Sequence, residues 1–436
     1  MARFLIATIP VVGHVSPAKP IARQLIDRGH QVWWYTGGAF QASVESTGAH
    51  FVPIRSGLDY SFPENVPKAA VQPRDALRGL AQLKFDLKYF FIESAIAQVA
   101  DLRQILQEFP ADVILADFCF LGAAWLHEQG GPPWAGFGVS VLALSSQDTP
   151  PFGLGLLPNA SLWGRFRDRS LYWLIQRLFR DLLADTNQIR AQMGLPATTQ
   201  GFFDTLSPFL HLAGTVPAFE YPRRDLPPQV HFIGPLLASV TDEFTPPPWW
   251  ADLQTDKPII LVTQGTVATN PADLIAPTLQ ALAQEDVLVV ATMGGVPIDR
   301  IQLNPIPANA RIASFIPFSH LLPSVDVMVT NGGYNGVQMA LAQGVPLIVS
   351  GQTEDKPEVA ARVEWAGVGI RLKPNKLTPD RLKTAVRQIL TDPQYKARAK
   401  QLQAIIAGYD APVRAVELLE QLAATQQPIN SGRSTV

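Results

Sequence analysis

A histidine near the start of the chain has the surroundings of a general base. The motif G-H-V-S-P, residues 13–17, directly follows residues 4–9, an apolar segment that predicts a buried strand. We expect Gly13 to allow a sharp turn and Pro17 to lie near the start of a helix, where its missing N–H costs nothing. His14 would then lie at the end of the first strand, where an imidazole can take the proton of an attacking hydroxyl group. A histidine that caps a helix or packs in the core is the alternative.

A carboxylate later in the chain can hold that histidine in place. Asp117 ends the apolar segment 113–116, which predicts another strand of the same sheet. A carboxylate beside an imidazole fixes its tautomer and stabilises the imidazolium. Asp112 begins the segment and therefore lies at the wrong end of the strand. Asp117 is thus the expected partner of His14, and a role in capping the next helix is the alternative.

The segment T-N-G-G-Y-N-G, residues 330–336, has the features of a phosphate site. It follows an apolar run, residues 325–330, and precedes a short helical pattern. Gly332 and Gly333 have no Cβ, so backbone amides there can approach a ligand closely. We expect Asn335 to cap the helix, and a helix N-terminus behind a glycine turn is a site for a phosphate.

Three consecutive charged residues follow on one loop: Glu354, Asp355 and Lys356. Carboxylates accept hydrogen bonds and ammonium groups donate them, so the loop suits a ligand rich in hydroxyl groups. A charged loop that contacts only water is the alternative.

These motifs resemble those of nucleotide-sugar glycosyltransferases of the UDP-glycosyltransferase type, with the bacterial macrolide glycosyltransferases as the nearest branch. G-H-x-x-P resembles the catalytic histidine motif of that family. Residues 330–363 resemble its donor-sugar signature, which reads roughly H-G-G, a serine three positions on, E-A-L, G-x-P and D-Q. The resemblance implies an α/β fold with two Rossmann-like domains that face each other across a cleft, the GT-B fold.

The resemblance also implies an inverting, metal-independent glycosyltransferase that transfers a sugar (a hexosyltransferase). His14 would act as general base, assisted by Asp117, on a hydroxyl of a hydrophobic small-molecule acceptor. The donor would be a nucleotide sugar, with a UDP-sugar favoured and a dTDP-sugar as the alternative, and we expect no cofactor and no metal. The residues expected to contact the donor are Gly265, Thr266, Phe315, Pro317, Asn331, Gly332, Gly333, Asn335, Gly336, Asp355 and Lys356.

Several of these positions depart from the family pattern. Asn331 replaces the histidine, Gly336 the serine, and Lys356 the glutamine, while Met339 replaces a carboxylate that holds the ribose hydroxyls in the family. An asparagine amide can still donate to a phosphate oxygen but cannot become cationic, and a thioether is a poor substitute for a carboxylate. A catalytically inactive nucleotide-sugar-binding or helper protein of the same fold is therefore the alternative.

Two further positions on the donor side rest on the same resemblance. Phe315 can stack on the nucleotide base, with a core phenylalanine as the alternative, and Phe318 replaces a glutamine that would contact the base. A dinucleotide-dependent oxidoreductase is disfavoured, because no G-x-G-x-x-G motif follows the first strand.

Two series of alternating strand and helix patterns predict two parallel sheets, each covered on both faces. We expect an N-terminal acceptor-binding domain over residues 1–235, a linker over 236–256 and a C-terminal nucleotide-sugar-binding domain over 257–411. A C-terminal helix over 412–424 and a disordered tail over 425–436 would complete the chain.

Composition narrows the class of protein. The 436 residues contain 35 Lys plus Arg and 37 Asp plus Glu, so the formal charge of −2 does not favour a nucleic-acid partner. The one cysteine, Cys119, rules out an internal disulfide and fits a reducing cytoplasm, where we expect the protein. No Cys/His cluster has metal-ligand spacing. The oligomeric state stays open.

Two long inserts of the first half are rich in apolar and aromatic residues. The resemblance places acceptor binding there, and an apolar pocket suits a polyketide, phenolic, terpenoid or carotenoid acceptor. Residues 163–183 mix five arginines with aromatic residues and leucines. They fit a packed helix with a solvated face, and a helix that lies on an anionic membrane is the alternative.

Overall fold

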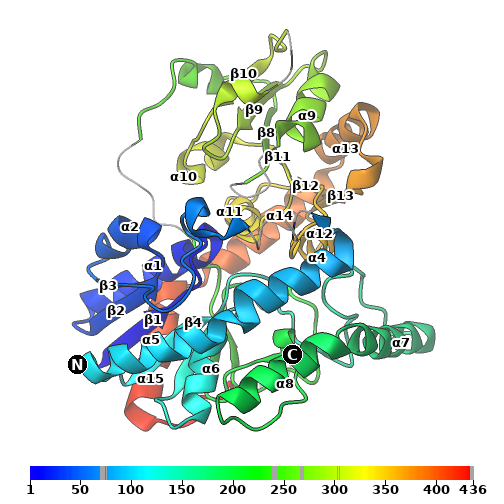
Figure 1. Cartoon of the computed structure of the whole chain (residues 1–436). Coiled ribbons are helices and arrows are strands. Elements are labelled where there is room, and N and C mark those ends of the chain that lie inside the picture. The colour runs from blue at the N-terminus through cyan, green and yellow to red at the C-terminus, as the bar shows by residue number, and fades with distance from the viewer. Residues whose placement is uncertain are drawn as a thin grey trace.

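Two parallel β-sheets form the frame of the protein (Figure 1). The computed structural model describes residues 1–68, 74, 76–237, 244–265, 270–301, 303 and 305–432. The first sheet has the order β3-β2-β1-β4-β5-β6-β7 and the second has the order β10-β9-β8-β11-β12-β13. The expected α/β fold with two Rossmann-like domains is confirmed.

The strands of the first sheet are β1 (Arg3–Ala7), β2 (Gln31–Thr36), β3 (His50–Pro53), β4 (Val113–Asp117), β5 (Trp134–Gly138), β6 (Leu210–Ala213) and β7 (Val230–Phe232). Those of the second are β8 (Ile259–Thr263), β9 (Leu288–Thr292), β10 (Ala310–Ala313), β11 (Val327–Thr330), β12 (Leu347–Val349) and β13 (Gly369–Arg371). Every residue of β4, β8, β9 and β11 is buried, as expected of parallel strands that helices cover on both faces. Each buried aliphatic side chain contributes about 1.5–3 kcal/mol.

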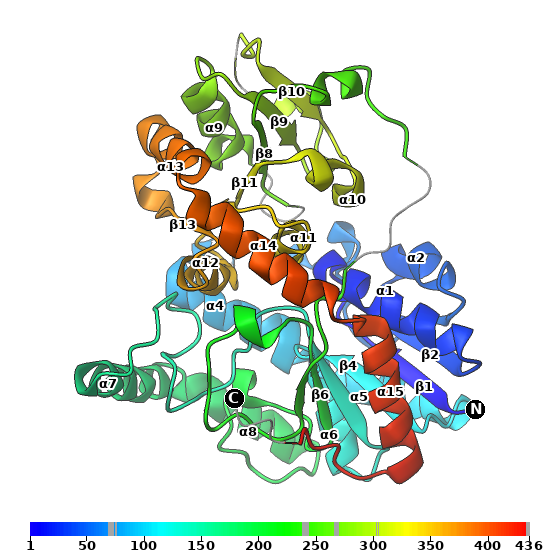
Figure 2. The same cartoon turned by 180° about the vertical axis from the view of Figure 1, so that it is seen from behind.

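Helices cover the faces of both sheets (Figures 1 and 2). In the first half they are α1 (Val12–Asp27), α2 (Gln41–Glu45), α4 (Gly79–Asp86), α5 (Ser94–Glu108), α6 (Leu121–Glu128), α7 (Leu162–Leu178) and α8 (Arg180–Gln192). In the second half they are α9 (Ile275–Leu282), α10 (Phe318–Leu321), α11 (Tyr334–Ala342), α12 (Lys356–Trp365), α13 (Pro379–Thr391) and α14 (Pro393–Ala407). None of the helices in the described ranges is long and apolar enough to cross a membrane.

The chain returns to the first domain at its end. Helix α15 (Ala411–Thr425) packs against α1, and Leu418 and Leu422 join the same core as Phe4. The sequence predicted a disordered tail over residues 425–436, whereas the described part, to residue 432, lies along the first domain. There the buried Ile429 donates its backbone N–H to the carbonyl of Phe209 at 2.8 Å.

A buried cluster of charges joins the two domains. Arg362 of α12 donates to Glu220 of the first domain at 2.9 Å and lies 3.2 Å from Glu358. Glu358 also accepts the backbone N–H groups of Gly153 and Gly155 at 2.9 and 2.7 Å. Buried charges are tolerated only when they are paired and hydrogen-bonded in this way, so the cluster defines how the two domains meet.

Candidate active site

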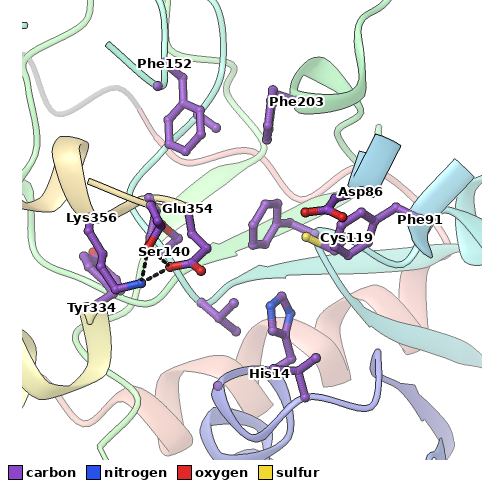
Figure 3. A pocket seen from close by; sticks show the side chains of 18 of the residues that line it. His14, Asp86, Phe91, Cys119, Ser140, Phe152, Phe203, Tyr334, Glu354 and Lys356 are labelled. Carbon is purple, nitrogen blue, oxygen red and sulfur yellow. Dashed lines mark hydrogen bonds and ion pairs between the residues drawn. The ribbon is translucent and has the colours of Figure 1, made fainter. Parts of the chain in front are cut away.

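A cavity of about 2020 Å³ lies between the two domains (Figure 3). His14 and Cys119 line it from the first domain, and Asn331, Gly333 and Lys356 line it from the second. A site for one drug-sized ligand has a volume of roughly 300–1,000 Å³. The cavity therefore has room for two ligands side by side.

His14 and Asp117, far apart in sequence, meet at the first-domain edge of this cavity. His14 Nδ1 lies 3.1 Å from Asp117 Oδ1, and the Asp117 side chain is fully buried. The His14 side chain keeps 16% of its surface exposed and points into the pocket (Figure 3). The His14 ring also stacks on Phe118, with ring centroids 5.8 Å apart.

Backbone amides hold Asp117 in one orientation. Its Oδ2 accepts the N–H of Ile9 at 2.7 Å and its Oδ1 accepts the N–H of Cys119 at 2.8 Å. Asp117 does not cap α6, whose N-cap is Phe120. Because an ionised carboxylate only accepts hydrogen bonds, the arrangement favours a proton on His14 Nδ1. The lone pair of Nε2 is then free to act in the cavity.

The helix that carries His14 begins earlier than the sequence predicted. Helix α1 starts at Val12, so His14 lies in its first turn and Pro17 lies inside the helix. Pro17 has no N–H to donate to the carbonyl of Gly13, four residues before it. Asn335 of the opposite domain instead approaches this carbonyl, with its Nδ2 at 3.5 Å. The two domains therefore touch beside His14.

The two glycines of the phosphate motif have different surroundings. Gly332 has φ +92°, and a Cβ there would lie 2.6 Å from Val349 Cγ1. The Gly332 amide donates to Thr330 Oγ1 at 3.2 Å, and its contact with a donor stays a prediction. Gly333 lines the cavity and has open space where its Cβ would be.

Helix α11 presents its first amides to the cavity. Gly333 is its N-cap, so the expected capping by Asn335 is wrong. The first four N–H groups of a helix lack intrahelical acceptors and carry partial positive charge. Residues of the first turn of α11 and its N-cap line the cavity, among them Gly333, Asn335 and Gly336. The turn can receive a phosphate group.

Asn331 precedes this turn in the chain, and its side chain forms a hydrogen bond within the protein. It is buried, and its Nδ2 donates to the carbonyl of Gln264. The asparagine amide thus links the ends of β11 and β8, and its Oδ1 has no partner among the described residues. Gly265 follows Gln264 and lines the cavity. Thr266, the other residue expected at this turn, lies outside the described residues.

The charged loop turns toward the cavity, but its groups also bond to one another (Figure 3). Asp355 accepts a hydrogen bond from Ser140 of the first domain, and burial raises the pKa of Asp355. Lys356 forms an ion pair with Glu354 and donates to Thr353 at 3.2 Å. Burial lowers the pKa of Lys356 to about 8, while the neighbouring carboxylate works in the opposite direction.

An apolar wall faces the cavity on the second-domain side. Phe315 is 62% exposed, which rules out a core role and leaves its ring free to stack on a base. Pro317 lines the same wall as the N-cap of α10. Phe318, Met328 and Met339 add apolar side chains to this wall, and the neighbouring Ser319 also lines the cavity.

Aromatic residues dominate the first-domain part of the cavity. Tyr60, Phe90, Phe91, Phe152 and Phe203 line it, and the last three surround the pocket in Figure 3. Tyr60, Phe90, Phe91 and Phe152 come from the two inserts that the sequence assigned to acceptor binding, residues 56–98 and 147–199, and Phe203 follows the second insert. Burial raises the pKa of Tyr60, so its hydroxyl stays protonated.

Two residues that the sequence analysis did not assign to the site lie in it. Ser140 follows strand β5 and bonds to Asp355, and the same rule that found Asp117, a polar residue after a buried strand, would have found it. Cys119 lies near His14 and Asp117, with potential metal-ligating atoms within 4.8 Å of one another. Burial, aided by Asp117 and Asp355, raises the pKa of the Cys119 thiol, and a protonated thiol is a poor metal ligand.

The chain is similar to known proteins over almost its whole length. Residues 276–422 match the family described as the erythromycin biosynthesis protein CIII-like C-terminal domain. A 4'-demethylrebeccamycin synthase from Lentzea aerocolonigenes is 45% identical over 97% of this chain and 99% of its own. A UDP-glycosyltransferase 2 from Phaeomoniella chlamydospora is 33% identical over 96% of this chain and 95% of its own. A solved structure of the glycotransferase of kitacinnamycin superposes with a TM-score of 0.75 at 23% identity, over 98% of this chain and 99% of the other.

Proposed function

The chain belongs to the UDP-glycosyltransferase-type family of GT-B glycosyltransferases, and from this premise we propose an inverting, metal-independent sugar transfer with His14 as general base. The donor is a nucleotide diphosphate sugar, and the acceptor is a hydroxyl of a hydrophobic small molecule. Asp117 positions the imidazole of His14 and stabilises its cationic form.

One observation carries this proposal. The His14–Asp117 pair and the first turn of α11 line the same cavity from opposite domains. A base and a phosphate site must flank the reacting carbon in a single displacement, because the nucleophile enters opposite the leaving group. An imidazole on one side and helix amides on the other meet that requirement.

The reaction follows from this geometry. His14 Nε2 takes the proton of the acceptor hydroxyl as the acceptor oxygen forms a bond to the anomeric carbon. The bond between that carbon and the diphosphate oxygen breaks, and its electron pair leaves with the nucleoside diphosphate. A single displacement of this kind inverts the anomeric configuration. The positive charge that develops on the imidazole is stabilised by the carboxylate of Asp117, which two backbone amides hold in place.

The leaving diphosphate gains negative charge, and the N-terminus of α11 is suited to receive it. The amides of Gly333, Asn335 and Gly336 and the helix dipole provide fixed positive partial charge there. Lys356, which lines the cavity, adds a cation while it is protonated. Gly265 belongs to the same proposed diphosphate site. Charge stabilisation by these groups gives the transfer no requirement for a metal ion.

The nucleoside is expected to lie against the apolar wall, stacked on Phe315. A UDP-sugar was favoured from the sequence, and the relative from Phaeomoniella chlamydospora is named a UDP-glycosyltransferase. Met339, however, provides no acceptor for a ribose 2′-hydroxyl, and its thioether suits a 2′-deoxyribose better. A dTDP-sugar is therefore the donor that this wall supports most strongly.

The acceptor occupies the aromatic part of the cavity. Aromatic rings bury large apolar areas and leave few polar groups to satisfy, so a planar or polycyclic molecule with one free hydroxyl suits the site. Asp355 and Ser140 then lie between the two halves, where Asp355 can accept hydrogen bonds from the donor sugar.

The test is release of free nucleoside diphosphate from a panel of UDP- and dTDP-sugars in the presence of mixed phenolic acceptors. Wild-type protein is expected to release nucleoside diphosphate and His14→Ala is expected to release none above background. The glycoside formed is expected to have the anomeric configuration opposite to that of the donor. A retained configuration contradicts the single displacement. No release from any donor favours the alternative of an inactive binding or helper protein.

A further inference from the structure

Helix α7 carries a row of exposed apolar side chains that no described part of the chain covers. Trp163 is 82% exposed, Phe166 65% and Trp173 64%. Leu162, Leu174 and Leu178 are exposed on the same helix. Gly164 and Asp168 of α7 are buried, Tyr172 and Ile175 are partly buried, and the exposed side of the helix carries these apolar residues. The helix projects from the side of the first domain in both views (Figures 1 and 2).

These side chains share one face of the helix. At about 100° per residue, the six apolar residues fall within an arc of about 160° around the axis. Single exposed apolar residues are ordinary, but a continuous face with two tryptophans marks an interaction surface. We call this surface the α7 face: Leu162, Trp163, Phe166, Trp173, Leu174 and Leu178.

Arginines surround the α7 face. Arg169, Arg177 and Arg180 are exposed and have no ion-pair partner among the residues that the structure describes. The acidic residues nearby are already paired: Asp168 with Arg167, Asp181 with Lys84 and Asp185 with Lys88. The α7 face is therefore both apolar and positively charged.

The opposite side of the same helix belongs to the acceptor part of the cavity. Tyr172 and Ile175 line the cavity on that side, and at the end of the helix Leu178, itself part of the α7 face, also lines the cavity, as does Phe179 directly after it. The exposed apolar side chains and the cavity-lining side chains therefore belong to the same helix. A molecule bound at the α7 face would be about one helix diameter from the cavity.

We propose that the α7 face docks the protein on an anionic lipid bilayer. Tryptophan rings prefer the boundary between headgroups and acyl chains, and free arginines attract anionic headgroups. A helix with an apolar face rimmed by arginines has the features of one that lies in this interface. A second copy of the chain fits less well, because a symmetric contact through this face would bring the unpaired arginines of both copies together. Resting on the proposed function, the docking lets an acceptor dissolved in lipid reach the cavity without crossing water.

The experiment is co-sedimentation of the full chain with vesicles of phosphatidylcholine alone and of phosphatidylcholine mixed with phosphatidylglycerol. Wild-type protein is expected to sediment with the mixed vesicles and to stay in solution with phosphatidylcholine alone. Arg169→Glu with Arg177→Glu, and separately Trp163→Ser with Trp173→Ser, are expected to weaken binding at least about tenfold. None of these four residues lines the cavity, so turnover of a water-soluble acceptor should be unchanged.

Matched controls change the same kinds of residue on the second domain. Ile298→Ser with Ile306→Ser removes two exposed apolar side chains there, and Arg381→Glu with Arg398→Glu reverses two exposed charges. Both controls are expected to bind vesicles like the wild type. Equal melting temperatures for all variants show that they are folded.

Wild-type protein that stays in solution with both kinds of vesicle overturns the proposal. So does binding that the α7 variants retain. A dimer that dissociates in Trp163→Ser with Trp173→Ser, together with no lipid binding, would assign the α7 face to a second copy and overturn it as well. Vesicle binding is measured without donor or acceptor, so its failure leaves the proposed sugar transfer untouched.

Discussion

The two sheet edges that face the cavity differ in how they hold their polar groups. On the first sheet, backbone amides of Ile9 and Cys119 fix Asp117, and Asp117 fixes His14. On the second sheet, Asn331 and Lys356 replace the residues typical of the family and bond to neighbouring protein groups. The proposed base is thus held by a carboxylate at the end of a strand, whereas on the donor side the first amides of α11 are surrounded by side chains that depart from the family pattern. We infer that the chemistry follows the family and that donor choice has diverged.

The largest effect is expected on the first sheet. His14→Ala removes the only group proposed to take the acceptor proton, and we expect kcat to fall by about 10²–10⁴. The measurement is steady-state turnover with saturating donor and acceptor. His50→Ala, which changes an exposed histidine on the same sheet, should leave kcat within twofold, about the scatter of surface substitutions.

Asp117→Asn tests whether His14 depends on the carboxylate beside it. An asparagine cannot stabilise the imidazolium, so kcat is expected to fall while the affinity for the donor stays the same. Unaltered kcat in either His14→Ala or Asp117→Asn would remove the base–carboxylate pair from the mechanism. Thermal unfolding of each variant distinguishes loss of chemistry from loss of fold.

We expect Gly332 and Gly333 to have different roles, Gly332 in stability and Gly333 in donor binding. Gly332→Ala forces a side chain onto φ +92° and against Val349, so we expect the free energy of unfolding to fall by about 1–3 kcal/mol. Gly333→Ala has no such clash, and its unfolding free energy should change by less than about 0.5 kcal/mol. Its methyl group projects into the cavity, so the KM for the donor is expected to rise. Urea unfolding and donor kinetics measure the two effects, and equal destabilisation by both changes would contradict this distinction.

Donor choice is expected to respond to Met339. Met339→Glu introduces a carboxylate on the nucleoside wall, and a hydrogen bond to a ribose hydroxyl would raise the preference for UDP-sugar over dTDP-sugar by about tenfold. The ratio of kcat/KM for the two donors measures this preference. Met339→Leu keeps the wall apolar and should leave the ratio unchanged. A ratio that Met339→Glu does not alter would place the ribose elsewhere.

The smallest effect is a pH dependence. Burial lowers the pKa of Lys356 to about 8, so its ammonium loses a proton as the pH rises through that value. Its attraction for the diphosphate is then lost, and the KM for the donor is expected to rise a few-fold above about pH 8. Lys356→Arg stays charged at every pH in this range and should show a flat profile. A rise in KM that persists in Lys356→Arg would assign the titration to another group.

Much of the fold and the position of the His14–Asp117 pair could be predicted because the signals for the strands are local. The apolar segments at residues 4–9 and 113–116 correspond to β1 and β4, and parallel strands bring their carboxyl ends to one edge. The sequence placed His14 and Asp117 at that edge, and the pairing of β1 with β4 in the structure brings them together. The helix at residues 412–424 was also recognised from its period.

The donor turn could not be predicted in detail, because its contacts come from distant parts of the chain. The carbonyl of Gln264, for example, accepts a hydrogen bond from the side-chain amide of Asn331. Asparagine is a residue type that often caps helices, but α11 begins one residue before Asn335. The side-chain amide of Asn335 instead reaches the Gly13 carbonyl, which Pro17 cannot pair because it has no N–H. The exposure of Phe315 depends likewise on tertiary packing that no periodicity reveals.

A crystal structure of the protein soaked with dTDP or UDP tests the central claim most directly. We predict that the terminal phosphate oxygens lie about 3 Å from the amides of Gly333, Asn335 or Gly336, with Nε2 of His14 facing them across the space for the sugar. A diphosphate bound away from this turn, or a His14 ring turned out of the cavity when the nucleotide is present, would contradict the account.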